Sequence, residues 1–266
     1  MAIYTSMSFK EIAKHYNAIN FIPEKSATEI GECIRDLIGR ESHLLDMGAG
    51  AGRISVSIAK AGARVTALDI EPEMLAVAGE LAASMNIPIT LVEGDVTTLP
   101  FASNSFDAVF TSNVLHLVSN WKTSLREVQR VLKPGGLFIQ GRDWLSPNAF
   151  ASEMKMEFRK IVALLNPEML PTAAAGPMLF QELHLIGAEP ASEIIASAWT
   201  EEASPLLLFE KMKNRTYNET WQLEEPLFSE SLRRFEAWLK KQPIELSHSE
   251  TIQRRFVLYI SRGLKS

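Results

Sequence analysis

The sequence predicts an α/β fold with a mostly parallel sheet and helices on both faces of that sheet. Short apolar runs, which are typical of buried strands, alternate with segments in which apolar residues recur at helical spacing. From residue 28 to residue 142 this alternation has the intervals of βαβ units. After residue 143 helix-like stretches and irregular joints dominate, which predicts a helical insertion or cap in the C-terminal half.

The first half contains the expected strands of the sheet and the helices between them. Pro72 suits the first turn of a helix, and Pro134 with the two glycines after it is expected to stop one. The segments expected to form strands are HLLDM, RVTALDI, PITLVEGD, FDAVFTSN and GLFIQGR. Helical spacing is found in residues 28–38, GRISVSIAKAG, EPEMLAVAGELAASMN and NWKTSLREVQRVLKPGG.

The second half adds helices and the last strands. FASEMKMEFRKIVALL and SESLRRFEAWLKKQ have helical spacing, whereas ASEIIASAWT alternates like a strand and RRFVLYISR suits a closing strand. Four of the five tryptophans lie in this half, and core packing explains them better than contact with a substrate. We therefore expect a core with an N-terminal helical segment over residues 1–142, a helical cap or substrate region with one core strand over 143–250, and the final core strand over 251–266.

Composition excludes several classes of function. The 266 residues are 46% apolar and 22% charged, with a net charge of -5 and acids among the basic residues, so we expect no nucleic-acid partner. Because Cys33 is the single cysteine, no intrachain disulfide can form and a reducing, cytoplasmic location is expected. The N-terminal residues do not have the pattern of a signal peptide, and no apolar run reaches the roughly 18 residues of a membrane span.

The most informative segment is LLDMGAGAGR, residues 44–53. Its glycines at 48, 50 and 52 lie between the first strand and the following helix, where an open α/β sheet binds its ligands. Arg53 stands where the dinucleotide fingerprint needs glycine or alanine, and no lysine follows Gly52 as a phosphate-binding P-loop requires. A plain turn would need one glycine rather than three.

Three carboxylates at strand ends narrow the kind of ligand. Asp46 precedes the loop and would attract a cation, while Asp69 ends the second strand where a carboxylate suits ribose hydroxyls. Asp95 follows the third strand and would accept from an amino group on a base, with Val96 against the ring. A ligand with a cationic end, a ribose and a base but no phosphate fits S-adenosyl-L-methionine.

The chain resembles class I S-adenosylmethionine-dependent methyltransferases of the small-molecule type, with a domain similar to methyltransferase domains 11 and 25. The resemblance covers about residues 40–142 and rests on LLDMGAGAGRIS, VTALDIEPEML, EGDVTTLPF, FDAVFTSNVLHLV and VLKPGGLFI, in this order. It implies a Rossmann-like seven-stranded sheet of order 3-2-1-4-5-7-6 with the seventh strand antiparallel. RRFVLYISR suits that strand.

The resemblance also implies the cofactor, S-adenosyl-L-methionine, with S-adenosyl-L-homocysteine as product, and the residues that bind it. Asp46 and the loop glycines would hold the methionine end, Asp69 the ribose, Asp95 and Val96 the adenine. Asn113 would lie near the reactive centre, and Met74 and Leu115 would pack on the adenosine. The full set of expected positions is Asp46, Gly48, Ala49, Gly50, Gly52, Asp69, Ile70, Met74, Asp95, Val96, Asn113 and Leu115.

A sulfonium methyl is already activated, so alignment of the acceptor and exclusion of water matter most. We expect no metal, because no His/Cys/Asp cluster has metal-ligand spacing. His116 follows the fourth strand and is the candidate general base, with a packed or capping histidine as the alternative. His15 and Tyr16 are the candidates on the substrate side, because family members often fold an N-terminal helix with an aromatic residue over the cofactor.

The predicted function is methyl transfer to a small molecule, with oxygen, nitrogen and carbon all open as the accepting atom. The region rich in Trp, Phe, Leu and Met after residue 143 suggests an enclosed, apolar acceptor site. Two alternatives stay open: a nicotinamide-dependent oxidoreductase on a similar sheet, and a non-catalytic binding protein with a methyltransferase fold. The sequence does not determine the oligomeric state.

Overall fold

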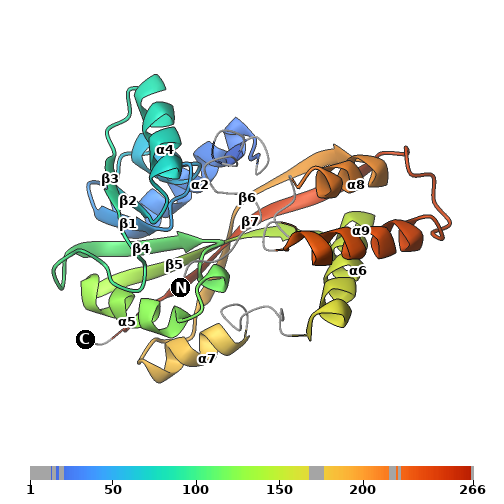
Figure 1. The fold of residues 1–266 in the computed structure, drawn as a ribbon. Coiled ribbons are helices and arrows are strands. Elements are labelled where there is room, and N and C mark those ends of the chain that lie inside the picture. Colours follow the sequence, from blue (N-terminus) through green and yellow to red (C-terminus); the bar gives the residue numbers. More distant parts are fainter. Residues whose placement is uncertain are drawn as a thin grey trace. The chain divides into compact units, whose positions relative to one another are not determined.

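The computed structural model describes residues 13, 16, 17, 21–167, 177–215, 220 and 223–264. Its strands form one seven-stranded sheet in the order β3-β2-β1-β4-β5-β7-β6 (Figure 1). The sheet is mostly parallel with some antiparallel strands, so the predicted fold class and strand order are confirmed. The strands are β1 (His43–Met47), β2 (Arg64–Asp69), β3 (Thr90–Glu93), β4 (Phe106–Ser112), β5 (Leu132–Leu145), β6 (Ser192–Ala203) and β7 (Glu250–Ser261).

Register brings the carboxyl ends of the central strands to one edge of the sheet. β1 pairs in parallel with both β2 and β4, so that Asp46 lies opposite Ala67 on one side and Phe110 on the other. β2 pairs in parallel with β3, with Asp69 opposite Glu93. Because parallel strands end at a common edge, the residues that follow β1, β2, β3 and β4 are neighbours in space.

Helices cover the sheet through a shared apolar core. Leu125 and Val128 of α5 pack in one cluster with Val109 of β4 and Phe138 of β5, all at most 1% exposed. The helix α4 contacts β2 and β3, which follow β1 in the strand order in the direction away from β4. The helices associated with this part of the sheet are α2 (Glu24–Ile38), α3 (Ser55–Lys60), α4 (Pro72–Ser84), the 3-10 turn η1 (Leu115–Leu117), α5 (Trp121–Val131) and α7 (Pro177–Leu185).

β5 starts earlier than the sequence pattern predicts. The helix α5 ends at Val131 rather than at Pro134, because Leu132 already has extended backbone angles and pairs with Phe106 of β4. The next pairs join Ala108 to Leu137, so the segment 133–136 bulges between two paired positions. The bulge accommodates a proline and two glycines that would break a regular strand.

The chain divides into two compact units. One, here called the sheet unit, comprises Phe9–Asp143, Thr172–Ala198 and Phe256–Ser266. The other, the helical unit, has its described residues within Trp144–Pro171 and Trp199–Arg255. Residues 177–198, which the sequence groups with the C-terminal region, therefore cluster with the sheet unit.

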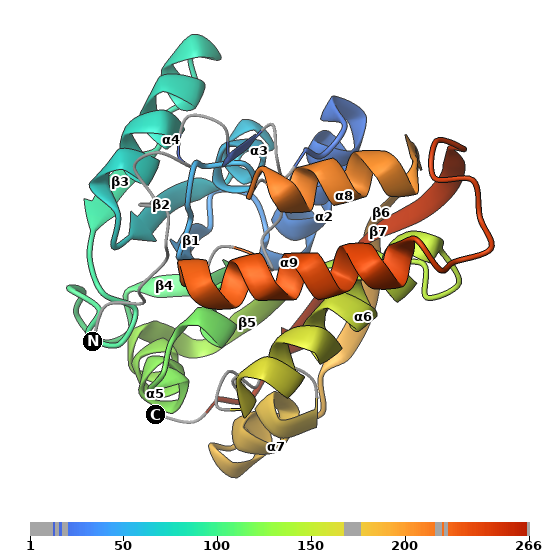
Figure 2. The same ribbon diagram turned by 45° about the vertical axis from the view of Figure 1, so that its right-hand side comes forward.

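The helical unit has a hydrophobic core of its own. It contains α6 (Phe150–Leu165), α8 (Pro205–Lys213) and α9 (Glu225–Leu239), and α6 contacts both other helices (Figure 2). Phe235 of α9 is fully buried, with its ring 5.5 Å from that of Phe158 and 5.3 Å from that of Trp238. Met154 and Met212 are buried in the same cluster, whereas Met156 and Met178 are exposed, so this core takes up only part of the methionine content of the C-terminal half.

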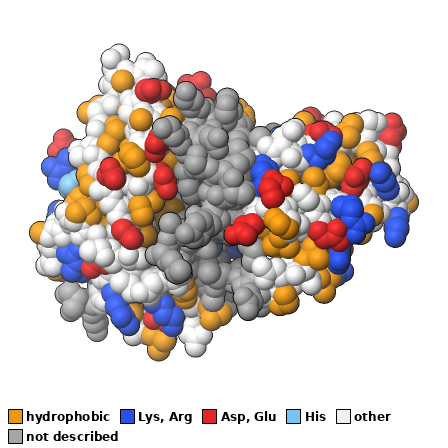
Figure 3. Space-filling view, viewed as in Figure 1, with side chains coloured by type: hydrophobic (Ala, Val, Ile, Leu, Met, Phe, Trp, Pro, Cys, Tyr) orange, Lys and Arg blue, Asp and Glu red, His pale blue; other side chains and the backbone are white. Residues whose placement is uncertain are grey.

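Charged side chains of both signs are interspersed on the face of the helical unit that Figure 3 shows. On α9 the carboxylate of Glu230 pairs with Arg233 at 2.8 Å and with Arg234 at 2.7 Å, and Glu236 pairs with Lys240 at 2.8 Å. On this helix, acids therefore lie among the basic residues in space as they do in the sequence. Among the described residues, none of the helices has the length and apolar character needed to cross a membrane.

Candidate functional site

The loop after β1 is bound to its neighbour strand through its backbone. The amides of Gly48 and Ala49 both donate to the carbonyl of Leu68 at the end of β2, at 2.8 and 2.9 Å. The amide of Gly50 donates to the Asp69 carboxylate at 2.7 Å. Three successive loop amides therefore have acceptors within the protein, and they do not form a cradle for a phosphate.

The three glycines of the loop share a left-handed backbone, and two of them are also closely packed. All three have positive φ, at +80° for Gly48, +53° for Gly50 and +76° for Gly52. A Cβ at Gly48 would lie 2.3 Å from a methyl of Val114, and one at Gly52 would lie 2.8 Å from the Cβ of Ala78 on α4. A Cβ at Gly50 would meet the ring of Tyr16 at an ordinary 3.7 Å. Close packing within the protein thus explains Gly48 and Gly52 without any ligand.

Asp69 is held at the end of β2 with both of its oxygens engaged. Oδ2 accepts the amide of Gly50, and Oδ1 accepts the amide of Glu71 at 3.0 Å. Burial raises the pKa of this carboxyl, and the hydrogen bonds from the amides of Glu71, Gly50 and Ile70 oppose that rise. A carboxylate has about four lone-pair positions, so these three amides leave an acceptor position for a further donor.

Asp46 is the most deeply buried acid of the site. It is 2% exposed, and the hydroxyl of Ser55 at the start of α3 donates to its Oδ2. Burial raises the pKa of Asp46 to about 7, with the negative charge of Asp69 adding to the rise and Ser55 and Arg53 opposing it. The site therefore holds a carboxyl whose charge responds to a cation placed beside it.

The third predicted acid lies in a different environment. Asp95 is exposed, and its Oδ1 accepts both the amide and the hydroxyl of Thr97 at 2.7 Å. Ile70, directly after β2, is 58% exposed and offers apolar surface at the same edge of the sheet. Three other positions predicted to contact the cofactor are buried in the core: Met74 at 2%, Val96 at 7% and Leu115 at 3% exposure. Their contact with an adenosine stays a prediction.

A polar cluster not predicted from the sequence joins the ends of β4 and β5 to the glycine loop. Asp143 of β5 accepts at its Oδ2 from the Nη2 of Arg53 at 3.2 Å and from the Nδ2 of Asn113 at 3.0 Å. Asn113 follows β4 with a left-handed φ of +57°. The signal for Asp143 was its place at the carboxyl end of an expected strand, the same signal that identified Asp46, Asp69 and Asp95.

Tyr16 lies among these charges. Burial raises the pKa of its phenol; Arg53 lowers it, whereas Asp69, Asp143 and Asp46 raise it. The next residue, Asn17, donates from Nδ2 to the carbonyl of Ala51 at 3.0 Å. Tyr16 is therefore beside the glycine loop, where the sequence analysis expected an aromatic residue, and its role there stays a prediction. His15 lies outside the described residues.

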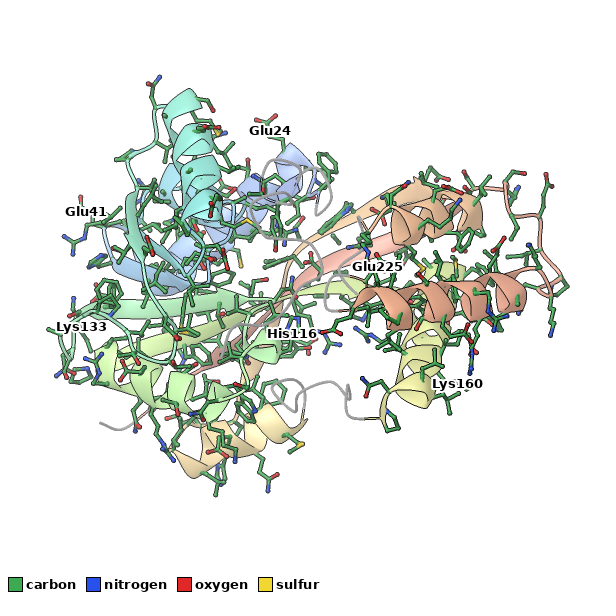
Figure 4. All side chains as sticks on the ribbon, in the orientation of Figure 1. Glu24, Glu41, His116, Lys133, Lys160 and Glu225 are labelled. Carbon is green, nitrogen blue, oxygen red and sulfur yellow. The ribbon has the colours of Figure 1, made fainter. Side chains whose placement is uncertain are left out.

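Histidines occupy both ends of the sheet. His116 is exposed on η1, beyond the carboxyl end of β4 and at the opposite end of β4 and β5 from Lys133 (Figure 4). His43 starts β1 at the other end, where its Nε2 lies 2.9 Å from the hydroxyl of Thr66. His116 is thus the histidine of these two that lies at the ligand end of the strands.

Among the residues described, no three His, Cys, Asp or Glu side chains are arranged to hold a metal ion. The acids of the site act separately, each bound to amides, a hydroxyl, or a guanidinium. The arrangement offers anionic groups, exposed apolar surface and a loop without free phosphate-binding amides.

Residues 45–140 match the family described as methyltransferase domain. This segment is a class I S-adenosylmethionine-dependent methyltransferase domain. The matched range starts in β1 and ends in β5, so it contains the glycine loop and the three predicted acids. Arg53 and Asn113 also lie within the methyltransferase domain, whereas Asp143 lies three residues beyond its matched end.

Curated relatives of the methyltransferase domain act on small molecules, as their names state. A sterol 4-C-methyltransferase of Caenorhabditis elegans is 27% identical over 176 residues, which are 57% of this chain and 52% of that protein. A ubiquinone/menaquinone biosynthesis C-methyltransferase of Nitrobacter hamburgensis is 44% identical over 101 residues, 36% of this chain and 40% of that protein. A demethylmenaquinone methyltransferase of Staphylococcus aureus is 34% identical over 137 residues, 49% of this chain and 56% of that protein. The chain thus spans about half the length of the curated relatives it matches.

Solved structures share the fold over most of the chain. An S-adenosylmethionine-dependent methyltransferase from Aquifex aeolicus matches with a TM-score of 0.51 at 18% identity, covering 70% of this chain and 92% of that one. The [4+2]-cyclase SpnF matches with a TM-score of 0.53 at 16% identity, covering 88% of this chain and 82% of that one. At these identities the likeness concerns the fold alone, and the second protein is named for a different activity on that fold.

The residues of the site fit S-adenosylmethionine. The carboxylate of Asp69 retains an acceptor position for a hydroxyl donor such as one of a ribose. The exposed side chain of Ile70 offers apolar surface for a base. The engaged amides of the glycine loop leave no phosphate site, and this cofactor contains no phosphate.

Proposed function

We propose that the protein transfers the methyl group of S-adenosylmethionine to a small-molecule acceptor. The observation that carries this proposal is the state of the loop after β1. The amides of Gly48, Ala49 and Gly50 are bound to Leu68 and Asp69, and the carboxyls of Asp46 and Asp69 lie beside the loop, where a bound cation would favour their ionised form. A dinucleotide would need free amides for its pyrophosphate, so this observation disfavours the nicotinamide-dependent alternative.

Most of what the residues would contribute is binding and alignment. When bound, the cofactor supplies a methyl group already activated by a sulfonium charge. Asp69 would accept the ribose hydroxyls, Asp46 would face the cationic methionine end, and Asp95 with Val96 would contact the base. Asn113, beside the end of β4, would lie near the reacting methyl. The remaining task is to align the acceptor and exclude water.

The proposal for the acceptor rests on the names of relatives and not on the geometry of the site. Both a sterol and a quinone methyltransferase among the relatives are named as carbon methyltransferases, so carbon acceptors are the first to test. Those matches cover 57% and 36% of this chain, and one fold can serve different acceptors, so the names of the relatives do not fix the substrate. His116 would accept a proton from a hydroxyl or protonated amine. Residues 143–250 are the proposed substrate region, and protection of this region from proteolysis by cofactor plus acceptor analogue would test that role.

We also propose a cellular location for the protein and the absence of one class of partner. The single cysteine supports a cytoplasmic location, and the interleaved charges support the absence of a nucleic-acid partner. Both rest on composition. Fractionation of cells that express a tagged chain, and filter binding with duplex DNA, test them directly.

Two measurements on the full chain test the proposed function. Calorimetric titration with S-adenosylhomocysteine and with NAD should give binding for the first alone. Incubation with methyl-labelled S-adenosylmethionine and a set of phenols, quinols and sterols should move label to at least one acceptor. Binding without any methyl transfer to a broad acceptor set would favour the non-catalytic alternative, and binding of NAD instead would reverse the assignment.

A further inference from the structure

Asp143 and Arg53 form an ion pair inside the wall of the proposed cofactor site. Nη2 of Arg53 lies 3.2 Å from Oδ2 of Asp143, and the two side chains are 13% and 21% exposed. The same carboxylate oxygen accepts from Asn113 at 3.0 Å. The pair therefore links the residue directly after the glycine loop to the ends of β4 and β5, across three neighbouring strands of the sheet.

This ion pair shares its surroundings with the acids of the site. The phenol of Tyr16, which lies against Gly50, is influenced electrostatically by Arg53, Asp69, Asp143 and Asp46 together. Three acids and one basic side chain are thus close enough to this phenol to change its pKa. If Arg53 were not paired, its charge would oppose any cation bound beside the loop.

We infer that Asp143 is a positioning residue that neutralises Arg53, so that the site keeps a net negative charge and selects the sulfonium cofactor over its thioether product. The inference rests on the proposed function, because it needs S-adenosylmethionine as the ligand. S-adenosylmethionine carries one positive charge more than S-adenosylhomocysteine, and the two are otherwise alike apart from one methyl group. A nearby charge therefore changes the ratio of their affinities, whereas a loss of shape weakens both.

The test is the ratio of the affinities for S-adenosylmethionine and S-adenosylhomocysteine, measured by calorimetry on the full chain. Asp143→Asn keeps the size of the side chain but removes the carboxylate charge that pairs with Arg53. We expect it to lower the preference for S-adenosylmethionine roughly three- to tenfold, the scale of one unit charge in a partly solvated site. Arg53→Met alone should shift the ratio the other way, and the double variant Asp143→Asn/Arg53→Met should return it close to the native value.

Asp107→Asn is the matched control. Asp107 also pairs with a cation, Lys133 at 2.8 Å, and also accepts a second bond, from the amide of His43 at 2.9 Å. Asp107 lies near the amino end of β4, next to the amino ends of β1 and β5 and away from the glycine loop, so its loss should leave the ratio unchanged even where it lowers stability.

Three results would overturn the inference. They are an unchanged ratio in Asp143→Asn, an equal loss of affinity for both ligands, or a double variant that does not recover the native ratio. If Asp143→Asn does not fold, Arg53→Met still decides the question, because an unchanged ratio in that variant contradicts the charge argument. A native protein that binds neither ligand would instead remove the proposed function, and the inference with it.

Discussion

The amide of Gly50 donates a 2.7 Å hydrogen bond to the carboxylate of Asp69, which fastens the glycine loop to the end of the neighbouring strand. One residue thus has two tasks, since Asp69 is also the acid expected to bind the ribose. Removing it changes both the shape of the loop and the contacts available to a ligand.

Asp69→Ala should weaken the binding of S-adenosylhomocysteine by about 1–3 kcal/mol, through the loss of charge-assisted hydrogen bonds. Asp95→Ala is a useful comparison, because Asp95 is exposed and accepts its hydrogen bonds from Thr97, two residues further along the chain. Titration calorimetry measures both. Native affinity in the Asp69 variant would exclude the ribose role.

The buried carboxyl of Asp46 should make stability depend on pH. Its pKa is about 7 in the folded protein against an ordinary value of 3.8, so between these values the folded state binds a proton that the unfolded state does not. Stability therefore falls as the pH rises from about 4 to 7, and Asp46→Asn should remove this fall. As the pH rises from 5 to 8, the free energy of unfolding of the native protein should fall by about 2–4 kcal/mol relative to that of the variant. Urea unfolding at both values checks this, and a difference that is constant with pH would contradict it.

Gly48→Ala should destabilise the protein for two separable reasons. The left-handed backbone disfavours alanine by roughly 1–2 kcal/mol, and contact with Val114 adds about 1–3 kcal/mol. Gly135→Ala is the matched control, because its φ of +78° is close to the +80° of Gly48 but nothing lies within 4 Å of the added Cβ. The double variant Gly48→Ala/Val114→Ala should recover part of the extra loss. Equal urea midpoints for the two single variants would show that Val114 does not matter.

His116→Asn should lower turnover by about 10²–10⁴-fold if the acceptor must lose a proton, while the affinity for S-adenosylhomocysteine stays near the native value. His184→Asn, a change at another exposed histidine on α7, should leave both quantities unaltered. Loss of cofactor affinity in the His116 variant would make it a residue of the cofactor wall. Full activity would leave it structural.

Much of the fold follows from patterns of short range. The alternation of apolar strands and helical segments predicts the parallel sheet, and the motifs in order predict its strand arrangement. Because parallel strands end at one edge, the sequence pattern alone predicts that the acids at positions 46, 69 and 95 lie at that edge. Their positions at the ends of β1, β2 and β3 agree with that expectation.

Other features depend on contacts between distant parts of the chain, which periodicity does not report. Arg53 and Asp143 are 90 residues apart, and Gly48 is closed in by Val114 from a different strand end. The bulge at the start of β5 arises from its register with β4, and Asp46 acquires its raised pKa from complete burial. Local sequence pattern determines which segments become strands and helices, because that choice depends on near neighbours. Which side chains meet, and how far each charge is removed from water, is set by the packing of the whole sheet unit.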